Sequence, residues 1–278
     1  MEIPKHPLAE VFGHLTTDFS ERAVGYRRNK LCPFNNKVPN CTKDKAKNPL
    51  GVCSIFHNHS PVITCPIRFR EDWLVVKDAA DFFFPEGARW SSLTEVRLND
   101  GDGKSAGNID VVLVAYDEKE RIYDFGALEI QAVYISGNVR EPFEYYMNDP
   151  QANQVMDWTG QPNYPCPDHL FSSQKLFARL SFKTGILKNW HKKMAVFLDL
   201  EEFSNVPNIE YTSRREAEVG WFIYNLIYDD RHQRYKLVKF DEKFSKFPLF
   251  PSSSTRPSKL DKFMKVLEEK ISKTVIIC

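Results

Sequence analysis

Two apolar runs joined by a short charged segment constrain this chain more than any other feature. Ile109–Tyr116 forms the first run, Ile122–Ile135 forms the second, and the five residues Asp117–Arg121 between them are all charged. Apolar runs with so short a polar connection are typical of an antiparallel β-hairpin. The sequence therefore predicts a largely buried hairpin over residues 109–135.

Hairpin geometry brings polar side chains of the two runs together. If the turn is centred on Lys119, Asp110 lies opposite Leu128, and a shift of one residue places Asp110 directly across from Glu129. Glu129 and Gln131 are two positions apart, so both side chains point to the same face of their strand. We therefore expect two carboxylates and one amide to meet within an otherwise apolar hairpin.

Acidic side chains in such a place need a compensating charge. Carboxylates that face each other repel, and their burial is costly. A divalent cation held by Asp110 and Glu129 would resolve both problems, and oxygen ligands suit Mg²⁺, which can activate water and stabilise charge on a phosphodiester. Two alternatives stay open, namely a structural pairing with Arg or Lys and an edge position that exposes Glu129 to solvent.

From about residue 71 onward, helical and extended patterns alternate. A helix that ends at Pro85, then the hairpin, a second helix and a short buried strand predict an α/β fold in which that last strand lies parallel within the same sheet. Two further strands and a C-terminal amphipathic helix, with Ser258 as its N-cap, close the chain. The expected elements are helices Trp73–Phe84 and Ser172–Trp190, strands Met194–Leu200, Val219–Tyr228 and Tyr235–Phe240, and a helix from about Ser258.

Charge and hydropathy narrow the possible partners and location. The net charge is +1, so a nucleic acid would have to be bound through local basic patches. We see no secretory signal in Met1–Phe19 and no stretch long enough to cross a bilayer. The expectation is a cytoplasmic protein without membrane contacts, in a reducing compartment where spaced cysteines indicate a metal before disulfides.

Residues 1–70 differ in composition from residues 71–278, and we predict a domain boundary between them. The first part is rich in polar runs, offers few residues for an ordinary core, and holds four of the six cysteines, with 8, 11 and 11 residues between successive members. Four thiolates can bind zinc or iron tetrahedrally and fix a small module. Free buried cysteines, or a mixed site using His57 or His59, are the alternatives. The predicted metal ligands are Cys32, Cys41, Cys53 and Cys65.

The hairpin residues also resemble a known active site. Gly107-Asn108-Ile109-Asp110, a gap of 18 residues, and Glu129-Ile130-Gln131 resemble the signature of the PD-(D/E)xK nuclease superfamily, and more narrowly the NotI-type restriction endonucleases with their Glu-x-Gln variant. The stretch Thr94–Leu98 is similar to that family as well and adds Glu95 to the site. Two positions depart from the general pattern, since Ile109 replaces a proline and Gln131 replaces a lysine. An amide cannot act as a charged base, so Gln131 would position water or phosphate.

This resemblance implies a fold, cofactors and an activity. The fold would be a restriction-endonuclease-like mixed sheet flanked by helices, preceded by a four-cysteine module that holds iron or zinc. The chain would be a Mg²⁺-dependent type II restriction endonuclease that hydrolyses both strands of a short palindromic DNA site, leaves 5′-phosphate ends, and acts as a homodimer. Alternatives are a repair or mobile-element nuclease without strict sequence preference, and a catalytically inactive, metal-stabilised DNA-binding protein.

Four basic residues are candidates for DNA contact. Two arginines follow the last cysteine of the predicted metal site, one lysine precedes Asp110, and one arginine follows the second hairpin strand. Arginine can read guanine edges and lysine mostly meets phosphates, whereas each could equally be an ordinary solvated surface residue. The candidates are Arg68, Arg70, Lys104 and Arg140.

Overall fold

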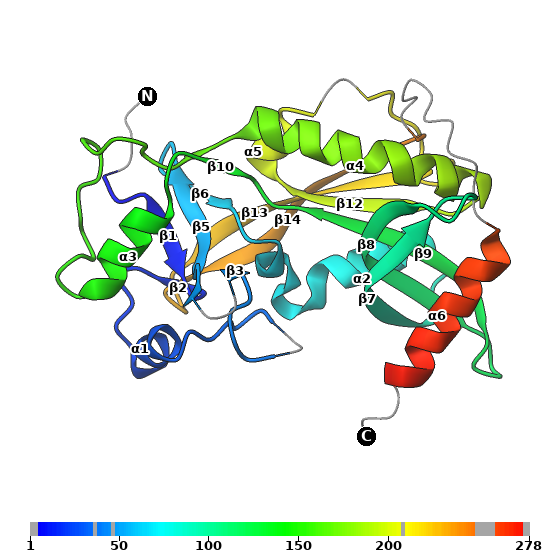
Figure 1. The fold of residues 1–278 in the computed structure, drawn as a ribbon, viewed down its shortest axis with the longest axis horizontal. Coiled ribbons are helices and arrows are strands. Elements are labelled where there is room, and N and C mark those ends of the chain that lie inside the picture. Colours follow the sequence, from blue (N-terminus) through cyan, green and yellow to red (C-terminus); the bar gives the residue numbers. More distant parts are fainter. Residues whose placement is uncertain (1–4, 36–37, 46–47, 207–208, 248–258, 275–278) are drawn as a thin grey trace.

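The structure is a computed structural model that describes residues 5–35, 38–45, 48–206, 209–247 and 259–274 (Figure 1). Its largest element is a six-stranded mixed sheet with the strand order β14-β13-β12-β9-β8-β7. The strands are β7 (Arg89–Asn99), β8 (Ser105–Tyr116), β9 (Ile122–Gln131), β12 (Met194–Asp199), β13 (Val219–Asp229) and β14 (Arg234–Ser245).

The predicted hairpin is formed by β8 and β9, at the middle of this sheet. Val111 pairs with Leu128, so the register is shifted by one residue from a turn centred on Lys119. Continuing this register places Asp110 directly across from Glu129. β12 runs parallel to β9, with Met194 beside Ala127. Both expectations for the central strands, the hairpin and the parallel crossover, are therefore confirmed.

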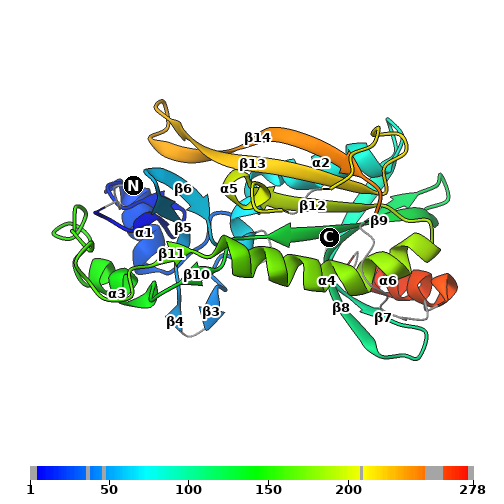
Figure 2. The ribbon, with the colours of Figure 1, turned by 90° about the horizontal axis from the view of Figure 1, so that it is seen from above.

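Helices cover both faces of the sheet (Figure 2). The helix α2 (Leu74–Phe83) packs on one face, where Phe82 and Phe83 join a core with residues of β8, β9 and β13. The helices α4 (His169–Asn189) and α6 (Leu260–Thr274) pack on the other face. The predicted α/β architecture, a mixed sheet flanked by helices, is confirmed.

A second, smaller sheet is built mainly from the first part of the chain. Its order is β2-β1-β5-β6, with β1 (Leu8–Val11), β2 (His14–Leu15), β5 (Val52–His57) and β6 (Ser60–Ile63). The expectation that this region lacks an ordinary core is wrong, because Val11 and Ile55 are buried with Phe143 and Tyr146 of α3 (Arg140–Asn148). That core includes Phe143, Tyr146, Met156 and Trp158 from later in the chain, so composition within residues 1–70 could not reveal it. The boundary at residue 70 stays a prediction.

Several shorter elements connect these parts. They are α1 (Glu21–Arg28), β3 (Asp44–Lys45), β4 (Asn48–Pro49), the 3₁₀ helix η1 (Pro66–Trp73), β10 (Ile135–Ser136), β11 (Cys166–Pro167) and α5 (Leu200–Phe203). The sequence patterns missed β7 and underestimated the length of β14, whereas the predicted N-cap Ser258 lies outside the described residues. Within the described ranges, no helix is both long and apolar enough to span a lipid bilayer.

Candidate active site

Three neighbouring strands bring acidic residues to the same level of the sheet. Thr94 pairs with Val111 in the β7–β8 ladder, and continuing that register places Glu95 level with Asp110. Glu129 stands at the same level on β9, as the β8–β9 register requires. Residues opposite each other in antiparallel strands project to one face. The sequence thus gathers a row of three carboxylates across β7, β8 and β9.

Glu129 is the most deeply enclosed member of the row. Its side chain is fully buried, Oε1 accepts a hydrogen bond of 2.6 Å from Lys183 Nζ, and Oε2 has no hydrogen-bond partner among the described residues. Burial, and then the negative charge of Asp110, raise the pKa of Glu129 to about 7, against the opposing effect of Lys183. A buried carboxylate oxygen without a partner is costly unless a cation occupies its place.

Asp110 lies at the more open side of Glu129. Asp110 Oδ2 accepts a 2.8 Å hydrogen bond from the backbone N–H of Ile130, and Arg179 Nη1 lies 3.9 Å from the same oxygen. The aspartate side chain keeps 26% of its surface exposed. Asp110 is therefore accessible from solvent while Glu129 is not. A substrate phosphate can approach the site from the side of Asp110.

Glu95 is the solvent-exposed member of the row. Its backbone has a φ of 53°, and its Oε2 accepts a 3.4 Å hydrogen bond from Asn108 Nδ2. Lys270 of α6 donates to the carbonyl oxygens of Thr94 and Glu95 at 3.2 and 2.9 Å. The C-terminal helix α6 thus anchors the backbone of β7 at Glu95, the residue with the positive φ. Glu95 itself lies at the edge of the site.

Both ends of the Gln131 amide are engaged. The side chain is 2% exposed, its Oε1 accepts a 2.8 Å hydrogen bond from Arg179 Nη2, and its Nε2 donates to the Ala132 carbonyl at 2.7 Å. Gln131 therefore fixes the guanidinium of Arg179 beside Asp110. This is a positioning role that an uncharged amide can fulfil.

Lys183 is, like Arg179, a candidate site residue that the sequence patterns did not single out. It lies on α4, is buried, and donates from Nζ to Glu129 Oε1 and, at 2.5 Å, to the Asn108 carbonyl. The sequence did carry a signal for this residue. Leu176, Leu180 and Leu187 form the apolar stripe of the helix, and Lys183, seven residues after Leu176, falls on the same stripe. A buried lysine in a helical stripe needs an acidic partner.

The donor set of this site fits a magnesium ion. Glu129 Oε2 is unpartnered within the described chain, and Asp110 stands beside it with an accessible side chain. Magnesium is bound by one or two carboxylates and substrate phosphates, and it keeps several waters. Asp110 and Glu129 can therefore hold the ion, while Arg179 and Lys183 border it.

Arg68 was predicted to contact DNA, and the structure contradicts this. Its guanidinium is fully buried, with Nε 3.0 Å from a Glu10 carboxylate oxygen and Nη1 2.7 Å from Glu71. It also donates to the Tyr235 carbonyl at 3.0 Å. Arg68 therefore neutralises two buried acids between the N-terminal sheet and β14, and it cannot reach a nucleic acid.

The other three basic candidates remain at or near the surface. Arg70 is half-buried in η1, and Lys104 is exposed in the turn before β8. Arg140, at the start of α3, forms ion pairs with Asp44 and, at 3.4 Å, with Glu144. Their contact with DNA stays a prediction.

The four N-terminal cysteines line one small cavity, which is bordered by Phe12 and Phe34. All four are free thiols, and burial raises the pKa of Cys32 to about 11 and also raises that of Cys53. Among the described residues, no three of these sulfurs lie within 4.8 Å of one another, so a tetrahedral metal would draw them closer together. The four thiols thus share one cavity without forming a cluster at metal-ligand distances among the described residues.

The six-stranded mixed sheet with helices on both faces is consistent with a restriction-endonuclease-like fold. Residues 18–237 match the family model described as restriction endonuclease NotI, so the chain belongs to the NotI restriction endonuclease family. By family it is a type II site-specific DNA endonuclease, and hence a hydrolase that binds DNA. The matched span includes the acidic row, α4 and all four N-terminal cysteines, while α6 lies beyond it. No curated protein matches the chain.

Proposed function

We propose that the chain is a Mg²⁺-dependent restriction endonuclease of the PD-(D/E)xK type, acting as a homodimer on a short palindromic DNA site and leaving 5′-phosphate ends. The observation that carries the proposal is the state of Glu129, which is buried beside Asp110 with one oxygen on Lys183 and the other unpartnered within the described chain. A two-fold site calls for a two-fold protein, which supports the dimer.

Asp110 and Glu129 would hold the Mg²⁺ ion. When bound, Mg²⁺ stabilises the negative charge that develops on the phosphate during hydrolysis. Asp110 is the ligand open to solvent, so the scissile phosphate approaches from its side. Glu95 stands at the rim and adds negative charge beside Asn108.

Helix α4 supplies the positive charge that the hairpin lacks. Lys183 reaches Glu129 from α4 and places a buried ammonium group beside that carboxylate, whereas the general pattern has its lysine on the strand. Arg179, 38% exposed, presents its planar guanidinium toward the open side, where it can bind a phosphate through two parallel hydrogen bonds. Gln131 orients Arg179, so the two basic residues together replace the missing lysine.

The cysteine cavity would hold iron or zinc as a structural metal. Four thiols from separated segments at one cavity, in a chain expected to be cytoplasmic, support this proposal. Metal analysis of the purified protein tests it. About one iron or zinc per chain that is lost in Cys53→Ser agrees with the proposal, whereas the same metal content in both proteins refutes it.

Digestion of a defined phage DNA with Mg²⁺, followed by run-off sequencing of the ends, tests the main proposal. We expect cuts at one palindromic sequence, complete loss of cutting in Glu129→Ala, and normal cutting in the matched control Glu118→Ala, an exposed glutamate of the same hairpin turn. Cuts without a common sequence would indicate a repair or mobile-element nuclease instead. Wild-type protein that binds duplex DNA and never cuts it would refute the catalytic proposal and leave an inactive DNA-binding protein.

A further inference from the structure

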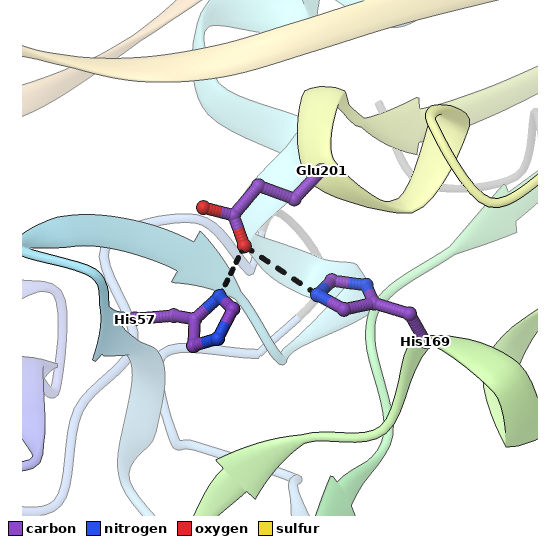
Figure 3. Close-up of side chains that lie close together, drawn as sticks. All are labelled: His57, His169 and Glu201. Carbon is purple, nitrogen blue, oxygen red and sulfur yellow. Dashed lines mark hydrogen bonds and ion pairs between the residues drawn. The ribbon is translucent and has the colours of Figure 1, made fainter. Parts of the chain in front are cut away.

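A second group of possible metal ligands lies apart from the acidic row and from the cysteines. His57 at the end of β5, His169 at the start of α4 and Glu201 in α5 place one ligand atom each within 4.8 Å of one another (Figure 3). Glu201 Oε2 lies 2.6 Å from His57 Nδ1 and 3.4 Å from His169 Nε2. Residues from three distant segments thus converge on a single carboxylate oxygen.

The ring of His169 is held in the orientation that a metal ligand needs. Its Nδ1 donates a 3.0 Å hydrogen bond to Glu202 Oε2, and the fully buried Glu202 accepts a second hydrogen bond of 3.0 Å from Ser173. A carboxylate on one ring nitrogen fixes the other nitrogen toward the metal in histidine metal sites. Here that other nitrogen, Nε2, is buried and faces Glu201 Oε2 at 3.4 Å, without a well-aligned hydrogen bond to any described residue.

The surrounding backbone is also fixed. The carboxylate of Asp199, at the end of β12, accepts the N–H of Glu201 at 3.0 Å and the N–H of Ile63 at 3.2 Å. These bonds hold α5 against β6 of the N-terminal sheet. The only basic groups that pair with Glu201 in the described part of the chain are the two imidazoles. A metal ion would therefore compete with no lysine or arginine at this carboxylate.

We propose that His57, His169 and Glu201 bind a zinc ion that joins the N-terminal sheet to the sheet of the active site. Two imidazole nitrogens and one carboxylate oxygen are a ligand set that zinc accepts, with water completing the tetrahedron. His57 belongs to the small sheet, whereas His169 and Glu201 belong to elements that pack on the large one. The ion would thus fix the first turn of α4, the helix that carries Arg179 and Lys183.

Zinc titration of the full-length protein tests the proposal after weakly bound metal has been removed by dialysis against a chelator. Isothermal titration calorimetry with Zn²⁺ is expected to show one equivalent more in the wild type than in His57→Ala or in Glu201→Gln, which keeps the shape of the side chain. The midpoint of thermal unfolding is expected to rise with Zn²⁺ in the wild type and to stay unchanged in both variants, because binding to the folded state alone stabilises it. Glu202→Gln is expected to weaken binding about 10–100-fold.

Control variants separate this site from the others. His59→Ala removes an exposed histidine two residues from His57 and is expected to bind as the wild type does. Glu129→Ala and Cys53→Ser are expected to keep the extra equivalent, so the result does not depend on DNA cleavage or on the cysteine cavity. Equal Zn²⁺ binding in the wild type, His57→Ala and Glu201→Gln would overturn the proposal and leave an ordinary histidine–glutamate ion-pair cluster.

Discussion

The ammonium group of Lys183 lies 2.6 Å from Glu129 Oε1, and both side chains are buried. A helix on one face of the sheet therefore contributes the cation of a site whose carboxylates come from the central hairpin. Glu129 keeps its second oxygen free of hydrogen bonds within the described chain, so the lysine satisfies only half of the buried carboxylate. This division leaves room for a metal ion beside an already fixed positive charge.

Replacement of Lys183 tests its part in cleavage. Lys183→Met keeps the volume of the side chain, removes the charge, and is expected to lower the rate of single-turnover cleavage about 10²–10³-fold, the usual effect of losing one preorganised electrostatic group. DNA affinity in a gel-shift assay should change little, because the lysine is buried. Lys188→Met, on the exposed side of the same helix, is the matched control and should cut normally. Equal rates for both variants would remove Lys183 from the site.

Introducing the lysine of the general pattern should harm the enzyme. In Gln131→Lys, a second cation would stand against Arg179, which in the wild type donates a hydrogen bond to the Gln131 oxygen. We expect cleavage to fall in Gln131→Lys and to recover in part in the double variant with Lys183→Met, because one lysine then serves the carboxylates again. Single-turnover rates of the four proteins form a double-mutant cycle that measures this coupling. Faster cleavage in the single variant Gln131→Lys would contradict the inference that Lys183 and Arg179 take the place of the lysine in the general pattern.

Arg68 should matter for stability and not for DNA binding. Arg68→Ala leaves Glu10 and Glu71 buried without their partner, and removal of one member of a buried ion pair costs about 3–5 kcal/mol of unfolding free energy. Urea denaturation monitored by circular dichroism measures this loss. The neighbouring variant Arg70→Ala should unfold as the wild type does and bind DNA more weakly. An Arg68→Ala protein of normal stability would show that the buried network has no such role.

Acid should weaken the N-terminal sheet through His6. Burial lowers the pKa of His6 from 6.5 to about 4, and its Nδ1 accepts a 3.1 Å hydrogen bond from the Leu8 N–H, which protonation would break. The neutral form is the one that the fold favours. The contribution of His6 is therefore complete above pH 6.5 and is lost as the pH falls toward 4.

Unfolding free energies of the wild type and of His6→Asn at pH 7 and pH 5 check this expectation. Asparagine can still accept the Leu8 N–H through its side-chain oxygen and does not titrate, so the variant should lose less stability between the two pH values. His232→Asn changes an exposed histidine and should behave as the wild type. A loss in His6→Asn as large as in the wild type would assign the acid sensitivity to other groups.

The sequence allowed the central part of the fold to be predicted because its signals are local. The charged segment Asp117–Arg121 sets the hairpin, Pro85 ends α2, and the apolar stripe of α4 identifies a helix that covers the sheet. The register was defined to within one residue, and that residue decides whether Asp110 meets Glu129. The acidic pair could therefore be named from sequence, although its exact alignment needed the structure.

The features that sequence missed depend on partners far along the chain. Lys183 acts on Glu129 across 54 positions, and Arg68 is buried because Glu10 and the Tyr235 carbonyl, 58 and 167 positions away, surround it. No local pattern distinguishes such an arginine from a surface one. His57 was considered as a ligand for the cysteine site, whereas its ring lies in one group of possible metal ligands with His169 and Glu201.

Helix α4 runs without interruption from His169 to Asn189. Because each residue turns the helix by a fixed angle, the number of residues between His169 and Lys183 determines the direction of the lysine side chain more than their identity does. One residue inserted between His169 and Lys183 would turn the lysine by about 100° around the helix axis and take it off Glu129, although every strand would keep its register. Within this stretch, the helix should thus tolerate many substitutions at exposed positions and few changes of length.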